Sequence, residues 1–171
     1  MSAAVEASLL FIDTDEEYLP AGYPWHINNI DPADDTGLLY IGGVEARRYV
    51  GAKDIACVIV LVTPKEYSAP NLLKLPDHVQ EHHYPIEDED GESIQRAIAA
   101  MLPHVEEHTA RGQRVLVHCW AGISRSASLV IAYLMKQHAV TADEALTRLR
   151  KKRPIVDPND GFMAQLRALT F

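Results

Sequence analysis

Residues 115–126 read Val-Leu-Val-His-Cys-Trp-Ala-Gly-Ile-Ser-Arg-Ser, and an apolar run follows at residues 129–135. The β-favouring residues indicate a strand, the segment containing glycine indicates a tight loop, and the apolar run indicates a helix. Backbone N–H groups of such a loop and the positive end of the helix dipole converge on one point and favour an anion there. We expect the rest of the chain to be organised around this strand, loop and helix.

Cys119 begins this loop and Arg125 ends it. The same field favours the ionised form of the Cys119 thiol, which is the nucleophilic form. The planar guanidinium of Arg125 can bind two oxygens of one phosphate group. Gly122 lets the backbone turn and approach a ligand closely, and the Ser126 hydroxyl can hydrogen-bond the thiolate. This combination indicates chemistry on a phosphate, whereas a buried cysteine on its own is usually inert.

The pattern His-Cys-x-x-Gly-x-x-Arg-Ser at residues 118–126 resembles the signature loop of the protein tyrosine phosphatase superfamily, and its flanks resemble the dual-specificity branch. Residues 39–42 resemble the early strand of that family, residues 84–88 its acid loop, and residues 158–166 its last-helix motif. The resemblance implies a small, single-domain (atypical) member. It also implies that phosphate is bound by the residues of the loop: Trp120, Ala121, Gly122, Ile123, Ser124 and Arg125.

Strand and helix patterns alternate along the chain, which indicates an α/β fold with helices on both faces of a sheet. The β-branched run at residues 55–62 is typical of a strand buried on both faces, and residues 93–112 carry a helical pattern. The resemblance implies the specific form, a central, mostly parallel, twisted sheet of about five strands flanked by helices. We expect residues 26–171 to form the catalytic domain and residues 1–25 to form a partly ordered arm.

Other local patterns predict the remaining elements. Residues 26–30 are expected to form a first strand, which ends at a following turn. Residues 64–80 are expected to form a loop or irregular helix. Pro103 should kink or split the helix in which it lies. Asp157 reads as an N-cap, with Pro158 at the first position of the last helix.

A thiolate that attacks phosphorus forms a phosphocysteine, which divides one difficult displacement into two easier ones. The leaving oxygen then needs a proton, and the same group can later activate water. Asp88 lies 31 residues before Cys119, in a Pro-x-Glu-Asp setting that resembles the acid loop of the family. We therefore choose Asp88 as the acid over its neighbours Glu87, Glu89 and Asp90.

Further residues are assigned roles by the same resemblance. His118 would orient the nucleophile and modulate its ionisation, without acting as the base. Asn159 would brace the active-site loops, although it could instead simply cap the last helix. His82 and His83 precede the acid loop without the spacing of a metal-ligand set, so we expect no metal and no cofactor.

Cys57 could suggest a disulfide that protects the nucleophile. If their two strands are neighbours and parallel, about five residues at ~3.3 Å each separate Cys57 from Cys119, which is about 16 Å. That separation is far beyond disulfide reach. Cys57 is therefore predicted to be a core residue.

The rim of the pocket is less well defined by sequence. The basic cluster at residues 151–153 reads as a solvated helix end, with a site for a second phosphate or an acidic substrate segment as the alternative. Trp120 could stack on a substrate at the mouth of the pocket.

The net charge of −8 argues against non-specific binding to nucleic acid. No run reaches the length of a membrane span, and two cysteines do not form a disulfide framework, which favours a reducing compartment. We therefore expect a monomer, resident in the cytoplasm or also in the nucleus, with neither nucleic acid nor membrane as a partner.

The resemblance implies phosphoprotein substrates, with phosphotyrosine and phosphoserine/threonine both hydrolysed through a phosphocysteine. Relatives that act on inositol lipids have extra lysines in the loop, and this chain has none there. A phosphatase of a non-protein ester, such as an inositol lipid or a glycan, is the first alternative. The second is a pseudophosphatase that binds phosphoproteins without catalysis.

Overall fold

The computed structural model describes residues 30–69 and 72–171. The predicted arm and residues 26–29 of the predicted first strand lie outside these ranges. Five strands form one sheet in the order β1-β2-β5-β3-β4, in which β1 is antiparallel to β2 and the other pairs are parallel. The predicted mostly parallel α/β sheet is thus confirmed. The strands are β1 (Ile30–Pro32), β2 (Leu39–Gly42), β3 (Ile55–Val60), β4 (Gln80–His83) and β5 (Arg114–His118).

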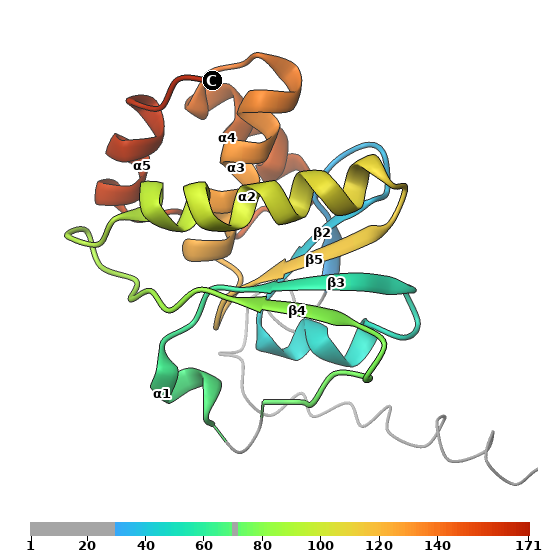
Figure 1. Cartoon of the computed structure of the whole chain (residues 1–171). Helices are drawn as coiled ribbons and strands as arrows, with labels where there is room; N and C mark the ends of the chain where they lie inside the picture. The colour runs from blue at the N-terminus through green and yellow to red at the C-terminus, as the bar shows by residue number, and fades with distance from the viewer. Residues whose placement is uncertain (1–29, 70–71) are drawn as a thin grey trace, which may run out of the picture.

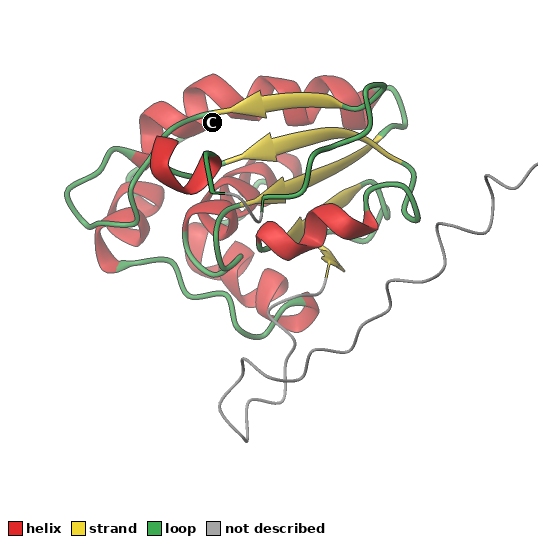
Figure 2. Ribbon diagram, turned by 90° about the horizontal axis from the view of Figure 1, so that it is seen from below, coloured by secondary structure: helices red, strands yellow, loops and turns green. Residues whose placement is uncertain are grey.

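Helices cover both faces of the sheet (Figure 1). Helices α2 and α3 lie on one face, with α4 and α5 packed outside α3, and the short helix η3 lies across the opposite face, as Figure 2 shows from below. The helices are η3 (Val44–Tyr49, a 3₁₀ helix), α1 (Pro64–Tyr67), α2 (Ile94–Ala110), α3 (Arg125–His138), α4 (Ala142–Lys152) and α5 (Asp160–Arg167). No helix within the described ranges combines the length and the apolar composition needed to cross a membrane.

The side chains of β3 explain why this strand is apolar along its whole length. Ile59 and Cys57 belong to the larger core, under α2 and α3, while Val58 and Val60 belong to the smaller core, under η3. Successive side chains of a strand point to opposite faces, so a strand covered on both faces needs apolar residues at every position.

The register of the parallel strands determines where the functional segments meet. Val60 of β3 is paired with His118 of β5 on one side and with His83 of β4 on the other. The three strands therefore end together, and the segments that follow them emerge at one edge of the sheet. Loops at the carboxyl ends of parallel strands are where α/β proteins bind their ligands.

Two of the predicted elements differ in the structure. The dipeptide Asp31-Pro32, predicted to end the first strand, lies within β1, where an edge strand tolerates proline because its N–H is not needed by a second neighbour. Helix α2 runs through Pro103 without a break. Pro103 and Ala99, whose carbonyl loses its helical partner, are both exposed, so water can bond that carbonyl.

The start of the last helix also differs from the prediction. Helix α5 begins at Asp160, two residues after Pro158, and its N-cap is Asn159, whose Oδ1 accepts the N–H of Phe162 at 2.8 Å. Asp157, predicted as the cap, instead forms an exposed ion pair with Arg150 at 2.8 Å. The carboxylate of Asp157 lies too early in the chain to serve the first turn, because a cap bonds the N–H two or three residues ahead.

Candidate active site

The loop between β5 and α3, residues 119–124, packs so closely against Gly42 and Gly43 that neither Gly122 nor Gly43 has room for a side chain. Gly122 has a φ of +71°, in the left-handed region that favours glycine, and a Cβ on it would lie 2.4 Å from the carbonyl carbon of Gly42. A Cβ on Gly43 would lie 2.8 Å from the carbonyl oxygen of Trp120. The Gly42-Gly43 pair, which sequence marks only as a strand end, is therefore part of the site.

The carbonyl groups of residues 120–123 all accept hydrogen bonds from outside the loop. The donors, in order, are Val44 N, Arg153 Nη2, Arg153 Nε and Asp157 N, at 2.9, 3.3, 2.9 and 2.9 Å. In a trans peptide the C=O and the following N–H point in opposite directions. The N–H groups of residues 121–124 therefore point toward the centre of the loop, where they form a cradle for an anion.

Arg153 is one of the residues that hold this cradle, and the sequence prediction for it is wrong. Arg153 is 1% exposed, and its side chain also pairs with Asp31 at 2.6 Å. Lys151 and Lys152 are exposed, as predicted for a helix end, but Arg153 turns inward beneath the loop. The local pattern of consecutive cations could not distinguish them, because the partners of Arg153 are far away in sequence.

Cys119 lies at the bottom of the cradle and is 1% exposed. Its Sγ accepts the N–H of Gly122 at 3.2 Å and lies 3.2 Å from the hydroxyl of Ser126. Ser126 belongs to the first turn of α3, so the sulfur also lies at the positive end of that helix. These donors stabilise negative charge on sulfur, and their geometry places the predicted Cys119 and Ser126 in contact.

Arg125 crosses the mouth of the cradle, and a carboxylate holds one side of its guanidinium. Nη1 and Nη2 donate to the two carboxylate oxygens of Glu66 at 2.7 and 3.1 Å, and Nη1 also donates to the carbonyl of Ile86 at 3.1 Å. Burial alone would lower the pKa of Arg125, but Glu66, Cys119 and Asp88 raise it above its usual value. Arg125 therefore remains a cation although it is 5% exposed.

The Nε–H of Arg125 is buried and has no hydrogen-bond partner among the described residues, although Nε lies 3.5 Å from Asp88 Oδ2. A buried donor without a partner is costly, and it is explained here if a phosphate oxygen completes it. Glu66 thus orients the guanidinium, and the Nε–H is left without a hydrogen bond.

Glu66 was not predicted as a site residue. Burial alone would raise the pKa of Glu66, but its bonds with Arg125 and Thr63 lower it. Thr63 and Glu66 form a capping box at the start of α1, with reciprocal bonds of 3.1 and 2.8 Å. The sequence carries a signal for it, since Thr-Pro-Lys-Glu is a helix-start pattern, but the weak periodicity of residues 64–80 favours a loop or irregular helix.

Asp88 is the carboxylate of the acid loop that contacts the cradle. Its Oδ1 accepts bonds from Ser124 Oγ at 2.6 Å and Asn159 Nδ2 at 2.9 Å, and its Oδ2 lies 3.5 Å from Arg125 Nε. Asp90, one of the rivals, instead accepts the N–H of Gly161 at 3.3 Å. The geometry therefore places Asp88, among the described carboxylates of residues 87–90, beside the loop.

Asn159 has both of the roles that the sequence leaves open: it caps the last helix and it braces the active-site loops. Its Oδ1 caps α5, its Nδ2 holds Asp88, and its backbone N–H donates to Ser124 Oγ at 3.1 Å. Ser124 in turn donates to Asp88. The last helix, the acid loop and the cradle are thus joined through one asparagine and one serine.

His118 lies behind the nucleophile and is fully buried. Arg47 donates from Nη1 to His118 Nε2 at 3.2 Å and also pairs with Glu81 at 2.7 Å. Since Nε2 accepts, the proton is on Nδ1, which donates to the Cys119 carbonyl at 3.1 Å. Burial, and then the charge of Arg47, lower the pKa of His118 to about 3. The ring is therefore neutral and orients the start of the loop.

Comparison with known proteins identifies the family of this chain. The model of the dual specificity phosphatase catalytic domain matches residues 40–170. The chain belongs to the dual specificity phosphatase family. It is 31% identical over 152 residues to dual specificity protein phosphatase 1-A of Xenopus laevis, which covers 89% of this chain and 40% of the relative. It is 34% identical over 113 residues to dual specificity protein phosphatase 1 of Arabidopsis thaliana, which covers 61% of this chain and 57% of the relative.

Solved structures of dual specificity phosphatases and their relatives share the fold. The human tyrosine phosphatase-like serine/threonine/tyrosine-interacting protein has a TM-score of 0.73 at 25% identity, covering 81% of this chain and 93% of that chain. DUSP15 has a TM-score of 0.71 at 26% identity, covering 82% and 86%. Together with the family match, these confirm the predicted family. The chain spans only part of the length of the curated relatives above.

Asn159→Asp separates the two contacts of this side chain in the dual specificity phosphatase site. Aspartate keeps the oxygen that caps α5 but loses the Nδ2 donor and places a second carboxylate next to Asp88. We expect kcat for phenyl phosphate to fall about tenfold or more, because Asp88 is no longer held in place. Asn159→Ala, which also loses the cap, should additionally lose about 1 kcal/mol of the free energy of unfolding. Wild-type turnover of phenyl phosphate by Asn159→Asp would contradict the bracing of Asp88.

The neutral His118 predicts an acid-sensitive fold. An unfolded histidine binds a proton near pH 6.5, whereas the folded His118 binds one only near pH 3. Between these values the unfolded state binds more protons, so stability falls as pH falls, by up to about 1.4 kcal/mol per pH unit. His118→Gln retains a donor and an acceptor without titrating. Urea unfolding at pH 7 and pH 5 should therefore show a loss about 2 kcal/mol larger in wild type than in His118→Gln; equal losses would contradict the assignment.

Proposed function

We propose that this chain is a protein phosphatase that hydrolyses phosphotyrosine and phosphoserine/threonine esters through a phosphocysteine on Cys119. The single observation that carries the proposal is that the inward N–H groups surround the Cys119 sulfur beside a cationic Arg125, whose Nε–H has no hydrogen bond. A phosphoryl group supplies the tetrahedral anion that these donors lack, within bonding reach of the sulfur.

In the first step the Cys119 thiolate attacks phosphorus, and the ester P–O bond breaks. Asp88 gives its proton to the leaving oxygen, which departs as the alcohol or phenol, while the phosphoryl group stays on sulfur. The N–H groups of the loop and Arg125 bind the three equatorial oxygens, where negative charge is concentrated.

In the second step a water molecule attacks phosphorus and the S–P bond breaks. Asp88, now a carboxylate, takes the proton from water, and inorganic phosphate is released. Cys119 leaves as a thiolate, which the Ser126 hydroxyl stabilises across the 3.2 Å contact. His118 holds the start of the loop and carries no proton in either step.

Phosphoproteins are the proposed substrates, acted on by a monomer in the cytoplasm or nucleus. The family membership supports this choice, as does the absence of lysine from loop positions 120–124. Extra cations there would favour a polyanionic headgroup. Trp120, which is partly exposed at the mouth, is available to stack on the substrate.

The substrate class is tested by measuring kcat/KM for phosphotyrosine peptides, phosphothreonine peptides, soluble inositol phosphates and a phosphorylated glucan side by side. We expect both phosphopeptides to exceed the other two classes. A strong preference for inositol phosphates or for the glucan would replace the proposal with a phosphatase of non-protein esters. Binding of phosphopeptides with no turnover of any substrate would favour a pseudophosphatase.

A further inference from the structure

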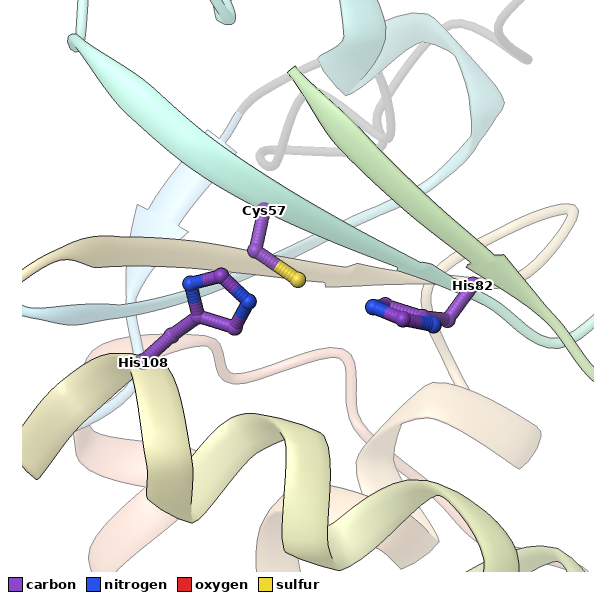
Figure 3. Close-up of side chains that lie close together, drawn as sticks. All are labelled: Cys57, His82 and His108. Carbon is purple, nitrogen blue, oxygen red and sulfur yellow. The ribbon is translucent and has the colours of Figure 1, made fainter.

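A second cluster of reactive side chains lies between the sheet and α2, and the proposed phosphatase mechanism does not use it. Cys57 comes from β3, His82 from β4 and His108 from α2, and their side chains point toward one another (Figure 3). One donor atom of each residue lies within 4.8 Å of the others. Three separate elements thus contribute one sulfur and two imidazole nitrogens to a single point.

The donor atoms of this cluster are buried and largely uncommitted. Cys57 and His108 are 0% and 3% exposed. Within the described residues, two buried side-chain polar atoms have no hydrogen-bond partner: Arg125 Nε, in the phosphate cradle, and His82 Nε2, in this cluster. An unpartnered buried polar atom costs about 1–3 kcal/mol, so His82 Nε2, like Arg125 Nε, indicates a ligand.

Neighbouring residues orient both imidazoles. The Nδ1–H of His108 donates to Gln113 Oε1 at 2.7 Å, so Nε2 is the ring nitrogen left to bind a cation. The ring of His82 is stacked on the ring of His104, with centroids 3.7 Å apart. The stacking orients the His82 ring, whose Nε2 has no hydrogen-bond partner among the described residues.

We propose that Cys57, His82 and His108 bind Zn²⁺ or a similar late first-row divalent cation. Thiolate and imidazole donors together suit Zn²⁺ and Co²⁺, whereas Mg²⁺ and Ca²⁺ require oxygen ligands. Three protein ligands leave the fourth position of a tetrahedron for water. This site lies apart from the phosphate cradle, and its existence does not depend on the proposed function.

The distances and the proton balance are compatible with binding. With Zn–S of about 2.3 Å and Zn–N of about 2.0 Å, the donor atoms of a tetrahedral site lie roughly 3.3–3.8 Å apart. Side-chain rotations that move the donor atoms by about 1 Å would bring them to these distances. Burial raises the pKa of the Cys57 thiol to about 12, so the thiol is protonated without metal. On binding, the S–H bond breaks, the S–metal bond forms, and the proton passes to solvent.

The position of the site predicts a structural effect. Among the described strands, β4 lies at the edge of the sheet and pairs with β3 alone. A metal bound by Cys57, His82 and His108 would join β4, β3 and α2. Because a cation that binds only the folded state stabilises it, Zn²⁺ should raise the melting temperature of the protein.

A disulfide between Cys57 and Cys119 is not an alternative use of the thiol. Cys57 is in register with Val115, four residues before Cys119 on the neighbouring parallel strand. Both cysteines are free thiols in the structure. The condition on which the distance argument depends, that the two strands are parallel neighbours, holds in the structure, and the argument against their pairing holds with it.

The test uses Co²⁺ as a spectroscopic probe in a Cys119→Ser background, which removes the other thiol. The full chain is stripped with a chelator, exchanged into clean buffer and titrated with Co²⁺. We expect one equivalent to give a thiolate-to-Co²⁺ charge-transfer band in the near ultraviolet and visible bands of tetrahedral Co²⁺, both abolished by Zn²⁺. A folded protein without the charge-transfer band would overturn the proposal.

Further substitutions in the same background assign the ligands. Cys57→Ala should remove the charge-transfer band, and His82→Ala and His108→Ala should each weaken Zn²⁺ binding by at least ~100-fold. Gln113→Ala, which frees the His108 ring, should weaken it by about 10-fold. His138→Ala, at an exposed histidine, is the matched control and should change neither. An unaltered band in Cys57→Ala, or equal Zn²⁺-induced melting shifts with and without His82, would contradict the site.

Discussion

Cys119→Ser is expected to lower kcat for p-nitrophenyl phosphate by about 10⁴-fold or more, as removal of other covalent nucleophiles does. The serine hydroxyl fits the same position among the same hydrogen-bond donors, but it stays neutral there and is a far weaker nucleophile than a thiolate. The cradle of N–H groups and Arg125 is left intact. Phosphate and vanadate should therefore still bind to the variant, which shows that its loop is folded.

Cys57→Ala is the matched control for the loss of a thiol. Cys57 lies beneath α2, away from the cradle, and its loss should leave the turnover of p-nitrophenyl phosphate near the wild-type value. Near-normal turnover by Cys119→Ser, measured with protein free of contaminating phosphatase, would remove Cys119 from the mechanism.

Asp88→Asn is expected to produce the second largest effect, and its size should depend on the leaving group. The amide keeps an oxygen that accepts the bonds from Ser124 and Asn159, but it cannot donate the proton that the leaving oxygen needs. For phenyl phosphate, whose leaving group is a poor one, kcat should fall by about 10²–10⁴-fold. For an aryl ester with a highly acidic phenol the loss should be much smaller, because that leaving group needs no proton.

Asp90→Asn serves as the control for the acid, because Asp90 contacts α5 and not the cradle. It should retain near-wild-type kcat with both esters. Equal slowing of both esters by Asp88→Asn, or the leaving-group dependence appearing in Asp90→Asn, would assign the acid to another residue.

The parts of the site that could be predicted from sequence are those encoded within one short segment. The strand, loop and helix around Cys119 and Arg125 are contiguous, so their residue types and spacing specify the cradle directly. Asp88 was found because its segment resembles a known acid loop, although the contact spans 36 residues to Ser124. The capping box at Thr141 predicted the start of α4 for the same local reason.

The parts that could not be predicted depend on contacts between distant segments. Glu66 lies 59 residues from Arg125, and Arg47 lies 71 residues from His118. Arg153 differs from its neighbouring lysines only in what the fold places beneath the loop. Cys57, His82 and His108 likewise show no ligand spacing, because the strand register and the packing of α2 bring them together.

The most direct test of the mechanism is to look for the phosphocysteine itself. The protein is mixed with excess p-nitrophenyl phosphate, quenched within milliseconds, and digested for mass spectrometry of the peptide that contains Cys119. We predict a phosphoryl group on the Cys119 sulfur, absent when the ester is omitted and absent in Cys119→Ser. Turnover with no phosphoryl group on Cys119, or with one on another residue under the same quench, would contradict the account.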